Sequence, residues 1–198
     1  LKWIERTGKS TADDNSFLFD VVSIFIQQKS LSIDLDLLYD NLKTQPVVMR
    51  TDVLSPFNRL TRKLGVLLVS GGAKPQVSFT MDRYYEFTAA SYLLLSNKVN
   101  TPQEFLAVSK QLRGNPLANQ IIEQVLFILT LEKGSQVIWE LIDIPDFDGY
   151  GRAMENIIAN VISQFIVYNE NTVEIVDLLT ASLTDNDFVI AESMIRNL

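Results

Sequence analysis

The sequence predicts a mainly α-helical fold with one short β-hairpin, divided into two domains at residues 1–96 and 97–198. Apolar residues recur at intervals of three or four through most of the 198 residues, which is the period of an amphipathic helix. No strand pattern returns after Met81. The two halves also differ in charge: residues 1–100 hold 12 Lys or Arg against 10 acids, and residues 101–198 hold 5 against 14. Net charges of +2 and −9 indicate two units with different surfaces.

The first helices are expected after a polar lead-in at residues 1–15. A helix over about 16–28 has apolar residues around most of its circumference, which predicts burial between neighbours. A second, short helix is expected to begin with Ser32 as its N-terminal cap, and Pro46 ends that segment.

The third helix is expected to begin with Ser55 as its cap and Pro56 at the first helical position, and to stop at Gly65. Two β-like runs follow at 66–69 and 76–79, separated by the turn-rich sequence Ser-Gly-Gly-Ala-Lys-Pro. Three helices followed by a β-hairpin is the order of a winged helix. We therefore expect the first domain to be a winged helix with its lead-in.

The second domain is predicted to be an irregular α-helical array of HEAT-like antiparallel helix pairs, because short loops join successive helices. Its C-terminal residues have the pattern of an unfinished helix, and residue 1 is Leu, so we expect a segment of a larger protein with the array truncated at its C-terminus. The helices that follow the hairpin are expected near residues 83–96, 102–113, 117–132, 135–142, 151–168, 172–183 and 186–198.

Composition excludes several kinds of chemistry. The chain has no Cys and no His, which removes disulfides, thiolate nucleophiles, the commonest metal ligand and the commonest general base. No apolar window is long enough to span a bilayer, and no signal-like segment opens the chain. We expect a cytoplasmic, non-enzymatic protein with no cofactor and no membrane partner.

A family resemblance is present between residues 65 and 90. A Gly-Val-Leu-Leu-Val run begins at Gly65, and after the turn the sequence Phe-Thr-Met-Asp-Arg-Tyr-Tyr-Glu-Phe-Thr-Ala-Ala begins at Phe79. This stretch resembles the winged-helix segment of signal-transduction NTPases of the STAND and NACHT kind, in which a strand, a wing and a helix lead into repeat arrays. The residues that fit the family pattern are Phe79, Asp82, Arg83, Glu86, Phe87 and Ala90.

The resemblance implies that these six residues form a joint between the winged helix and the first helix of the array. It also implies a nucleotide-binding core upstream of residue 1 and a sensor array that continues past residue 198. Met81 stands where animal members often have a nucleotide-sensing His, and its side chain cannot donate a hydrogen bond to phosphate.

Basic residues gather in and around the third helix and the hairpin. Residues 43–83 hold 7 basic residues against 2 acids, in positions where a DNA-binding winged helix would contact phosphates and bases. The same residues could instead form a solvated face or dock onto an acidic neighbour. The members of this candidate face are Arg50, Arg59, Arg62, Lys63 and Lys74.

Three further patterns are weaker. Gly8-Lys9-Ser10-Thr11 is similar to the end of a phosphate-binding loop, but Trp3 replaces its first glycine, so a polar loop is favoured. The acidic loop with Asp146, Asp148, Gly149 and Glu155 partly matches a calcium loop, but Ile144 occupies the first ligand position. Asp143, Asp146 and Asp148 could also be paired catalytic acids, but nothing nearby in the sequence supplies a pocket, so a plain connection between helices is favoured. A stacking surface is conceivable for the aromatic residues of one helix, but core burial is favoured for Tyr84, Tyr85, Phe87 and Tyr92.

Two hypotheses follow. The first is a non-catalytic regulatory module of a larger STAND-like NTPase, which couples a helical sensor array to the nucleotide-binding core and contacts other domains of its parent chain or protein partners. The alternative is a winged-helix DNA-binding protein with a helical tail that dimerises or binds a ligand.

Overall fold

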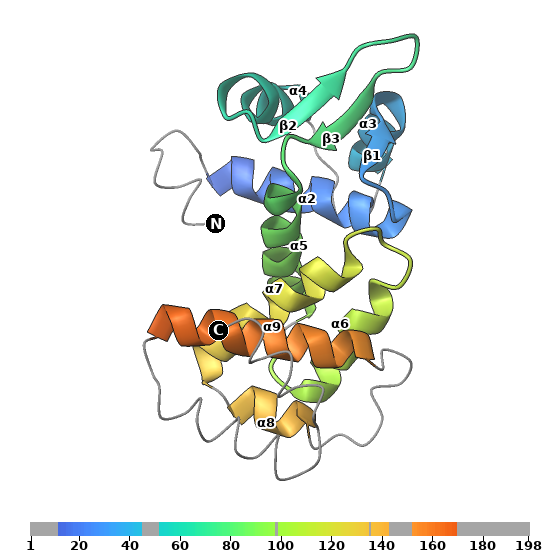
Figure 1. Cartoon of the computed structure of the whole chain (residues 1–198). Helices are drawn as coiled ribbons and strands as arrows, with labels where there is room; N and C mark the ends of the chain where they lie inside the picture. Colours follow the sequence, from blue (N-terminus) through green and yellow to red (C-terminus); the bar gives the residue numbers. More distant parts are fainter. Residues whose placement is uncertain (1–11, 45–51, 98, 135, 143–151, 170–198) are drawn as a thin grey trace. The chain divides into compact units, whose positions relative to one another are not determined.

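The computed structural model describes residues 12–44, 52–97, 99–134, 136–142 and 152–169 (Figure 1). These residues are mainly helical, with a small three-stranded antiparallel sheet. The chain divides into two compact units. Unit 1 comprises Leu1–Ser96 with Leu112–Ala118, and unit 2 comprises Asn97–Gln111 with Asn119–Leu198.

Unit 1 contains the sheet and most of the elements of the first half of the chain. Its α2 is buried around most of its circumference, as predicted, with Phe17, Val21 and Phe25 inaccessible to solvent. The predicted hairpin is also confirmed (Figure 1). The elements in chain order are α2 (Ala12–Gln28), β1 (Ser32–Asp34), α3 (Leu35–Thr44), α4 (Leu54–Asn58), η1 (Arg59–Lys63), β2 (Leu67–Ser70), β3 (Gln76–Phe79) and α5 (Asp82–Asn97).

The sheet contains a strand that the sequence did not predict. Its order is β1-β3-β2, and β1 pairs antiparallel with β3 with Ile33 opposite Val77. The expectation that Ser32 caps the second helix is therefore wrong. Asp34 takes that role, because its Oδ1 accepts hydrogen bonds from the backbone N–H groups of Asp36 at 3.0 Å and Leu37 at 3.2 Å.

The third helix also differs from its prediction at both ends. It begins at Leu54 rather than after Ser55, and the Oδ1 of Asp52 accepts a hydrogen bond from the Ser55 N–H at 3.1 Å. It continues as the π-helix η1, in which the Leu64 N–H donates to the Arg59 carbonyl at 2.9 Å. Gly65 ends it as predicted, with a φ of 62° that suits a residue without a Cβ.

Unit 2 holds the helices of the second half, close to where the sequence predicts them. The sequence Thr-Pro-Gln-Glu at 101–104 predicts a capping box before α6, and the structure confirms it. Glu104 Oε2 accepts hydrogen bonds from the N–H groups of Asn100 and Thr101, and the Glu104 N–H donates to Thr101 Oγ1. The bounds are α6 (Pro102–Gln111), α7 (Ala118–Lys133), α8 (Gln136–Ile142) and α9 (Arg152–Asn169).

Polar contacts join α7 to α9 within unit 2. The Glu123 carboxylate accepts hydrogen bonds from the side-chain amides of Asn160 at 3.0 Å and Gln164. The apolar side of α7, which includes Ile121, Val125 and Leu129, is buried. The two helices expected at 172–183 and 186–198 lie outside the described residues.

Candidate functional site

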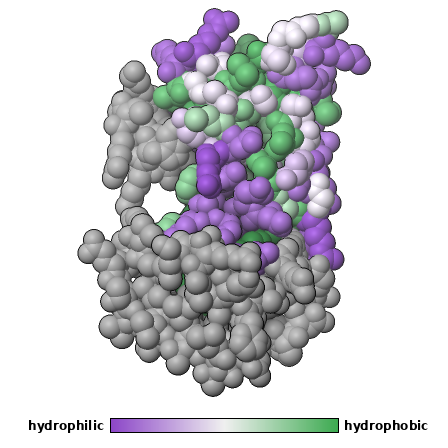
Figure 2. Space-filling view, in the orientation of Figure 1, coloured by the Kyte–Doolittle hydropathy of each residue, from purple (hydrophilic) through white to green (hydrophobic). Residues whose placement is uncertain are grey.

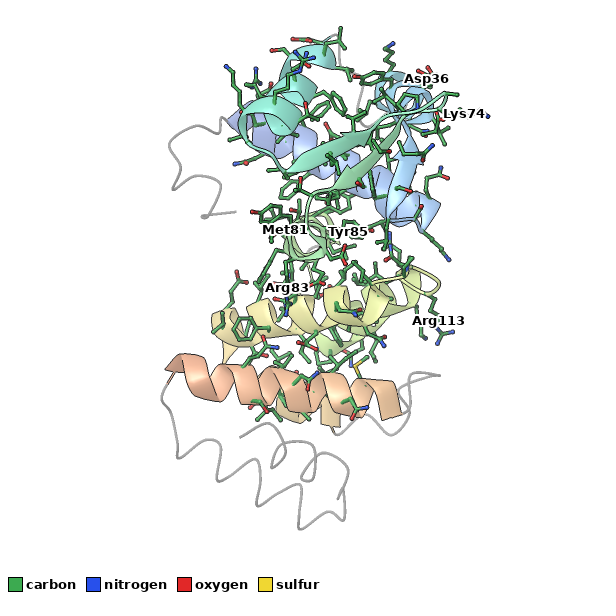
Figure 3. All side chains as sticks on the ribbon, turned by 45° about the horizontal axis from the view of Figure 1, so that its top comes forward. Asp36, Lys74, Met81, Arg83, Tyr85 and Arg113 are labelled. Atoms are coloured by element: carbon green, nitrogen blue, oxygen red, sulfur yellow. The ribbon has the colours of Figure 1, made fainter. Side chains whose placement is uncertain are left out.

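The predicted basic face is divided by the fold. Arg62 and Lys63 are exposed together at the end of η1. Lys74 is exposed in the hairpin turn, where the neighbouring Pro75 carbonyl accepts a hydrogen bond from the Leu35 N–H at 2.9 Å. This hydrogen bond places the hairpin turn, and with it Lys74, beside the start of α3 and close to Asp36 (Figure 3). Arg50, the fifth member of the face, lies outside the described residues.

Arg59 does not point outward, as a contact with nucleic acid would require. It docks instead onto acidic residues of the same chain, which is one of the alternatives left open for the basic face. Its guanidinium contacts Asp14 through Nε at 2.5 Å and Asp13 through Nη2 at 3.2 Å, and its Nη1 donates to Ser55 Oγ at 2.9 Å. The Asp14 side chain is 0% exposed and that of Arg59 is 26% exposed. A buried carboxylate is costly unless a cation or hydrogen bonds compensate it, so the guanidinium is engaged by the start of α2.

The electrostatic effect of this contact is consistent with its geometry. The hydrogen bond that the Arg59 guanidinium donates to Asp14 raises the pKa of Arg59 above its ordinary value. Partial desolvation opposes this rise, and the negative charges of Asp14 and Asp13 add to it. We call Arg59, Asp13, Asp14 and Ser55 the Arg59 cluster. It links α2 to the α4–η1 segment.

The predicted joint contains a group of packed aromatic rings. The Phe79 ring lies 5.4 Å from that of Phe25 and 5.2 Å from that of Tyr85, and the Phe25 and Tyr85 centroids are 5.8 Å apart. These separations are within the range of favourable aromatic pairs. We call Phe25, Phe79 and Tyr85 the aromatic cluster. It joins α2, β3 and α5 within unit 1.

The hydroxyl group of Tyr85 is bound by a residue from a distant part of the chain. Asn115 donates a hydrogen bond from Nδ2 to Tyr85 Oη at 2.8 Å, and both residues are buried. Burial raises the pKa of Tyr85 to about 12, and the hydrogen bond from Asn115 opposes that rise. The Asn115 Oδ1 accepts a hydrogen bond from the Leu117 N–H at 3.0 Å, which orients its amide. Figure 3 shows where Tyr85 lies on α5.

The other residues of the predicted joint fall on two sides of α5. Ala90 and Glu86 are buried with Phe79, whereas Asp82 and Phe87 are exposed. Arg83 donates from Nη1 to Glu86 Oε2 at 2.9 Å while remaining largely exposed. Met81 is exposed beside the start of the helix (Figure 3).

The favoured core interpretation of the aromatic residues holds for only some of them. Tyr85 is fully buried, and the Tyr92 ring lies 6.0 Å from that of Phe19. Phe87 is 39% exposed, so its assignment to the core is wrong. Phe87 occupies the solvent side of a helix whose opposite side, with Ala89, Ala90 and Leu93, packs inward.

Three residues of these clusters, together with Asn115, are not identified as important by the sequence. Asp13 and Asp14 lie in the predicted polar lead-in, Phe25 lies among the many apolar residues of the first predicted helix, and Asn115 lies between two predicted helices. Their partners lie far away along the chain, 45 residues for Asp14 with Arg59 and 30 for Asn115 with Tyr85. The Gly-Asn-Pro sequence at 114–116 signals a turn, but nothing in it identifies Tyr85 as the partner.

The patterns similar to a phosphate loop and to a calcium loop fall almost entirely outside the described residues. Gly8, Lys9, Ser10, Thr11, Asp143, Asp146, Asp148 and Gly149 lie outside them, and Glu155 lies in α9. Within the described ranges, no three His, Cys, Asp or Glu side chains are grouped to hold a metal ion. No helix in those ranges has both the length and the apolar character to cross a membrane.

No protein-family model, curated protein or solved structure matches the chain. Its function must therefore be inferred from the contacts described above.

Proposed function

We propose that the chain is a non-catalytic regulatory module in which the state of a helical array is coupled to a winged-helix domain, as in a STAND-like NTPase. The order of three helices and a hairpin in unit 1, with the added strand β1, supports the winged-helix assignment. The packed Phe79 and Ala90 support the joint implied by the family resemblance. The partners would be other domains of a parent chain or other proteins.

The observation on which the proposal depends is the location of residues 112–118. These residues connect α6 to α7, two helices that belong almost entirely to unit 2, yet they are part of unit 1. Asn115 holds this turn to unit 1 through the buried hydrogen bond to Tyr85. A displacement of α6 and α7 is therefore transmitted along the backbone to the aromatic cluster.

The cost of breaking that hydrogen bond gives the coupling its strength. A buried polar group left without a partner costs about 1–3 kcal/mol, so the turn should be either bound or released rather than gradually displaced. Tyr85 is also packed against Phe25 and Phe79, so a change at its hydroxyl alters the contact between α2, β3 and α5. Discrete rearrangements of packed elements are the usual means of transmitting a signal through a protein.

The alternative, a DNA-binding winged helix, depends on the exposed Arg62 and Lys63. The Arg59 cluster weakens it, because the central arginine of the candidate face is engaged by two aspartates. Lys74 lies near Asp36 rather than on η1. The regulatory module is therefore the function we favour.

Hydrogen exchange tests the coupling directly. Ile122→Val in the buried face of α7 should destabilise unit 2 by about 0.5–1.5 kcal/mol and leave it folded. We expect this substitution to speed exchange of the α5 amides around Tyr85 and Ala89 in unit 1. The transmitted effect should disappear in an Asn115→Ala background.

Asn119→Ala is the matched control, because Asn119 is exposed on α7 only four residues from Asn115. The transmitted effect should persist in that background. Exchange of the α5 amides that is the same with and without Ile122→Val would refute the coupling function.

A further inference from the structure

Strand β2 is an edge strand with backbone groups that point away from the sheet. The Thr80 N–H donates to the Val66 carbonyl at 2.9 Å, and from there the register places Leu67 opposite Phe79 and Val69 opposite Val77. Hydrogen-bonded and non-hydrogen-bonded pairs alternate in an antiparallel ladder, so Leu67 and Val69 form the non-hydrogen-bonded pairs. Their N–H and C=O groups face outward, where no described residue binds them.

The same strand exposes apolar side chains on both of its faces. Leu68 is 53% exposed and Val69 is 37% exposed, and successive side chains of a strand point to opposite sides. Figure 2 shows hydrophobic residues among hydrophilic ones over the upper part of unit 1, where β2 and β3 lie. The edge therefore offers both hydrogen-bonding groups and apolar contacts.

The two edges of the sheet differ in how they are protected. Natural edge strands are usually blocked by charged residues, proline or bulges, because a free edge pairs readily with another chain. The β1 edge carries Asp34 and is only three residues long. The β2 edge has the sequence Leu-Leu-Val-Ser, which contains no charge and no proline. An unprotected edge is the feature that β-strand addition requires.

The charges near this edge distinguish two candidate binding partners, a second copy of this chain and an acidic polypeptide segment. Arg62 and Lys63 are exposed just before β2, separated from it by Leu64, Gly65 and Val66. Antiparallel pairing with the β2 strand of a second copy would place these cations near residues 71–75 of that copy, which contain Lys74 and no acid. An acidic occupant would instead pair with both cations.

We propose that the β2 edge binds an extended segment of another polypeptide as an added antiparallel strand. The segment has a short apolar run that contacts Leu68 and Val69, followed by acidic residues. In antiparallel pairing the C-terminal end of the added segment lies at the start of β2, so its acidic residues meet Arg62 and Lys63. This site shares no residue with the coupling between Asn115 and Tyr85, so each proposal can fail without the other.

Fluorescence anisotropy with the 198-residue chain tests the proposal. The probe is a labelled peptide of alternating valine and threonine that ends in a run of glutamates. We expect it to bind with a Kd of roughly 10–100 µM, and at least about fivefold more tightly than the same peptide with lysines in place of the glutamates. No binding of the glutamate peptide up to about 1 mM would overturn the proposal.

Substitution of Val69 tests the mode of binding. Val69→Pro removes an N–H that the hairpin does not use, so the fold should persist while peptide affinity falls by about tenfold or more. Val69→Thr keeps the N–H and the strand preference, and its affinity should stay within about threefold of the unsubstituted chain. Equal binding by Val69→Pro and Val69→Thr would exclude strand addition.

The paired substitution Arg62→Gln with Lys63→Gln tests the role of charge. We expect it to weaken binding of the glutamate peptide by about fivefold, whereas Lys74→Gln, the control in the hairpin turn, should not. Equal losses for the two variants would contradict the assigned position of the acidic residues. Self-association of the unsubstituted chain in sedimentation velocity, abolished by Val69→Pro, would identify a second copy as the occupant and overturn the acidic segment.

Discussion

The Arg59 cluster and the aromatic cluster both fasten α2 to distant parts of unit 1, but they do so by different physical means. The aromatic cluster buries three rings, and its only described polar contact is the neutral hydrogen bond between Asn115 and Tyr85. The Arg59 cluster buries a carboxylate and compensates it with a guanidinium that remains partly exposed. The first depends on packing, and the second depends on a partner for a buried charge.

The difference shows which contacts a sequence reveals. The apolar period of α2 and α5 predicts that one side of each helix is buried, because burial of apolar surface is non-directional. The spacing of apolar residues carries no information that Arg59 points toward Asp14, because an arginine on a helix is usually solvated. For this reason the sequence alone places Arg59 in the candidate basic face, whereas the structure pairs it with Asp13 and Asp14.

The largest expected loss of stability comes from a substitution in the aromatic cluster. Phe25→Ala should destabilise unit 1 by about 3–5 kcal/mol, because it leaves a cavity between Phe79 and Tyr85. Phe87→Ala, at an exposed position of α5, should cost less than about 1 kcal/mol. Equilibrium unfolding in urea measures both, and equal losses would refute the description of the core.

The next largest effect is the dependence of stability on pH that the raised pKa of Tyr85 causes. Its folded pKa of about 12 lies above the ordinary value of 10.0, so the folded state holds the proton more tightly than the unfolded state. The stabilisation that the protonated Tyr85 hydroxyl gives to the folded state is complete below about pH 10 and is lost as the pH rises toward 12.

Between about pH 9 and pH 11 the free energy of unfolding of the unsubstituted chain should therefore fall by about 1–2 kcal/mol more than that of the Tyr85→Phe chain. Every other pH-dependent effect is common to both chains and cancels in the comparison. Identical pH dependence of the two chains would contradict the burial of this hydroxyl.

A smaller effect is expected when Arg59 is replaced by methionine. The substitution keeps an apolar stem but leaves the Asp14 carboxylate buried without its cation, so the urea midpoint should fall. The second change Asp14→Asn should restore part of the loss, because a neutral amide is less costly to bury. A midpoint unchanged by Arg59→Met would show that the cluster is not a structural link.

The smallest effect is expected in DNA binding. With Arg59 engaged, Arg62 and Lys63 of η1 and Lys74 of the hairpin turn remain for phosphates, so the slope of log K against log salt should not be steeper than about −3. Titration with duplex DNA at about 50 and 200 mM salt measures this slope. A much steeper slope would favour the DNA-binding alternative.

Local features were the most predictable from the sequence. Gly65 as a helix stop, the capping box of Thr101 and Glu104 and the hairpin each depend on neighbours within a few residues, and all three are confirmed. The strand β1 could not be predicted, because three residues of Ser-Ile-Asp become a strand only through pairing with β3. The bond from Asn115 to Tyr85 and the contact of Asp14 with Arg59 were likewise missed, because only the folded chain brings these residues together.

The measurement that tests the central claim most directly is a double-mutant cycle on Tyr85 and Asn115. The substitutions are Tyr85→Phe, which removes only the hydroxyl, and Asn115→Ala, with the two combined in a third chain. If this hydrogen bond holds the 112–118 turn to unit 1, urea unfolding should give a coupling energy of about 0.5–1.5 kcal/mol. Additive effects, within about 0.3 kcal/mol, would contradict the claim.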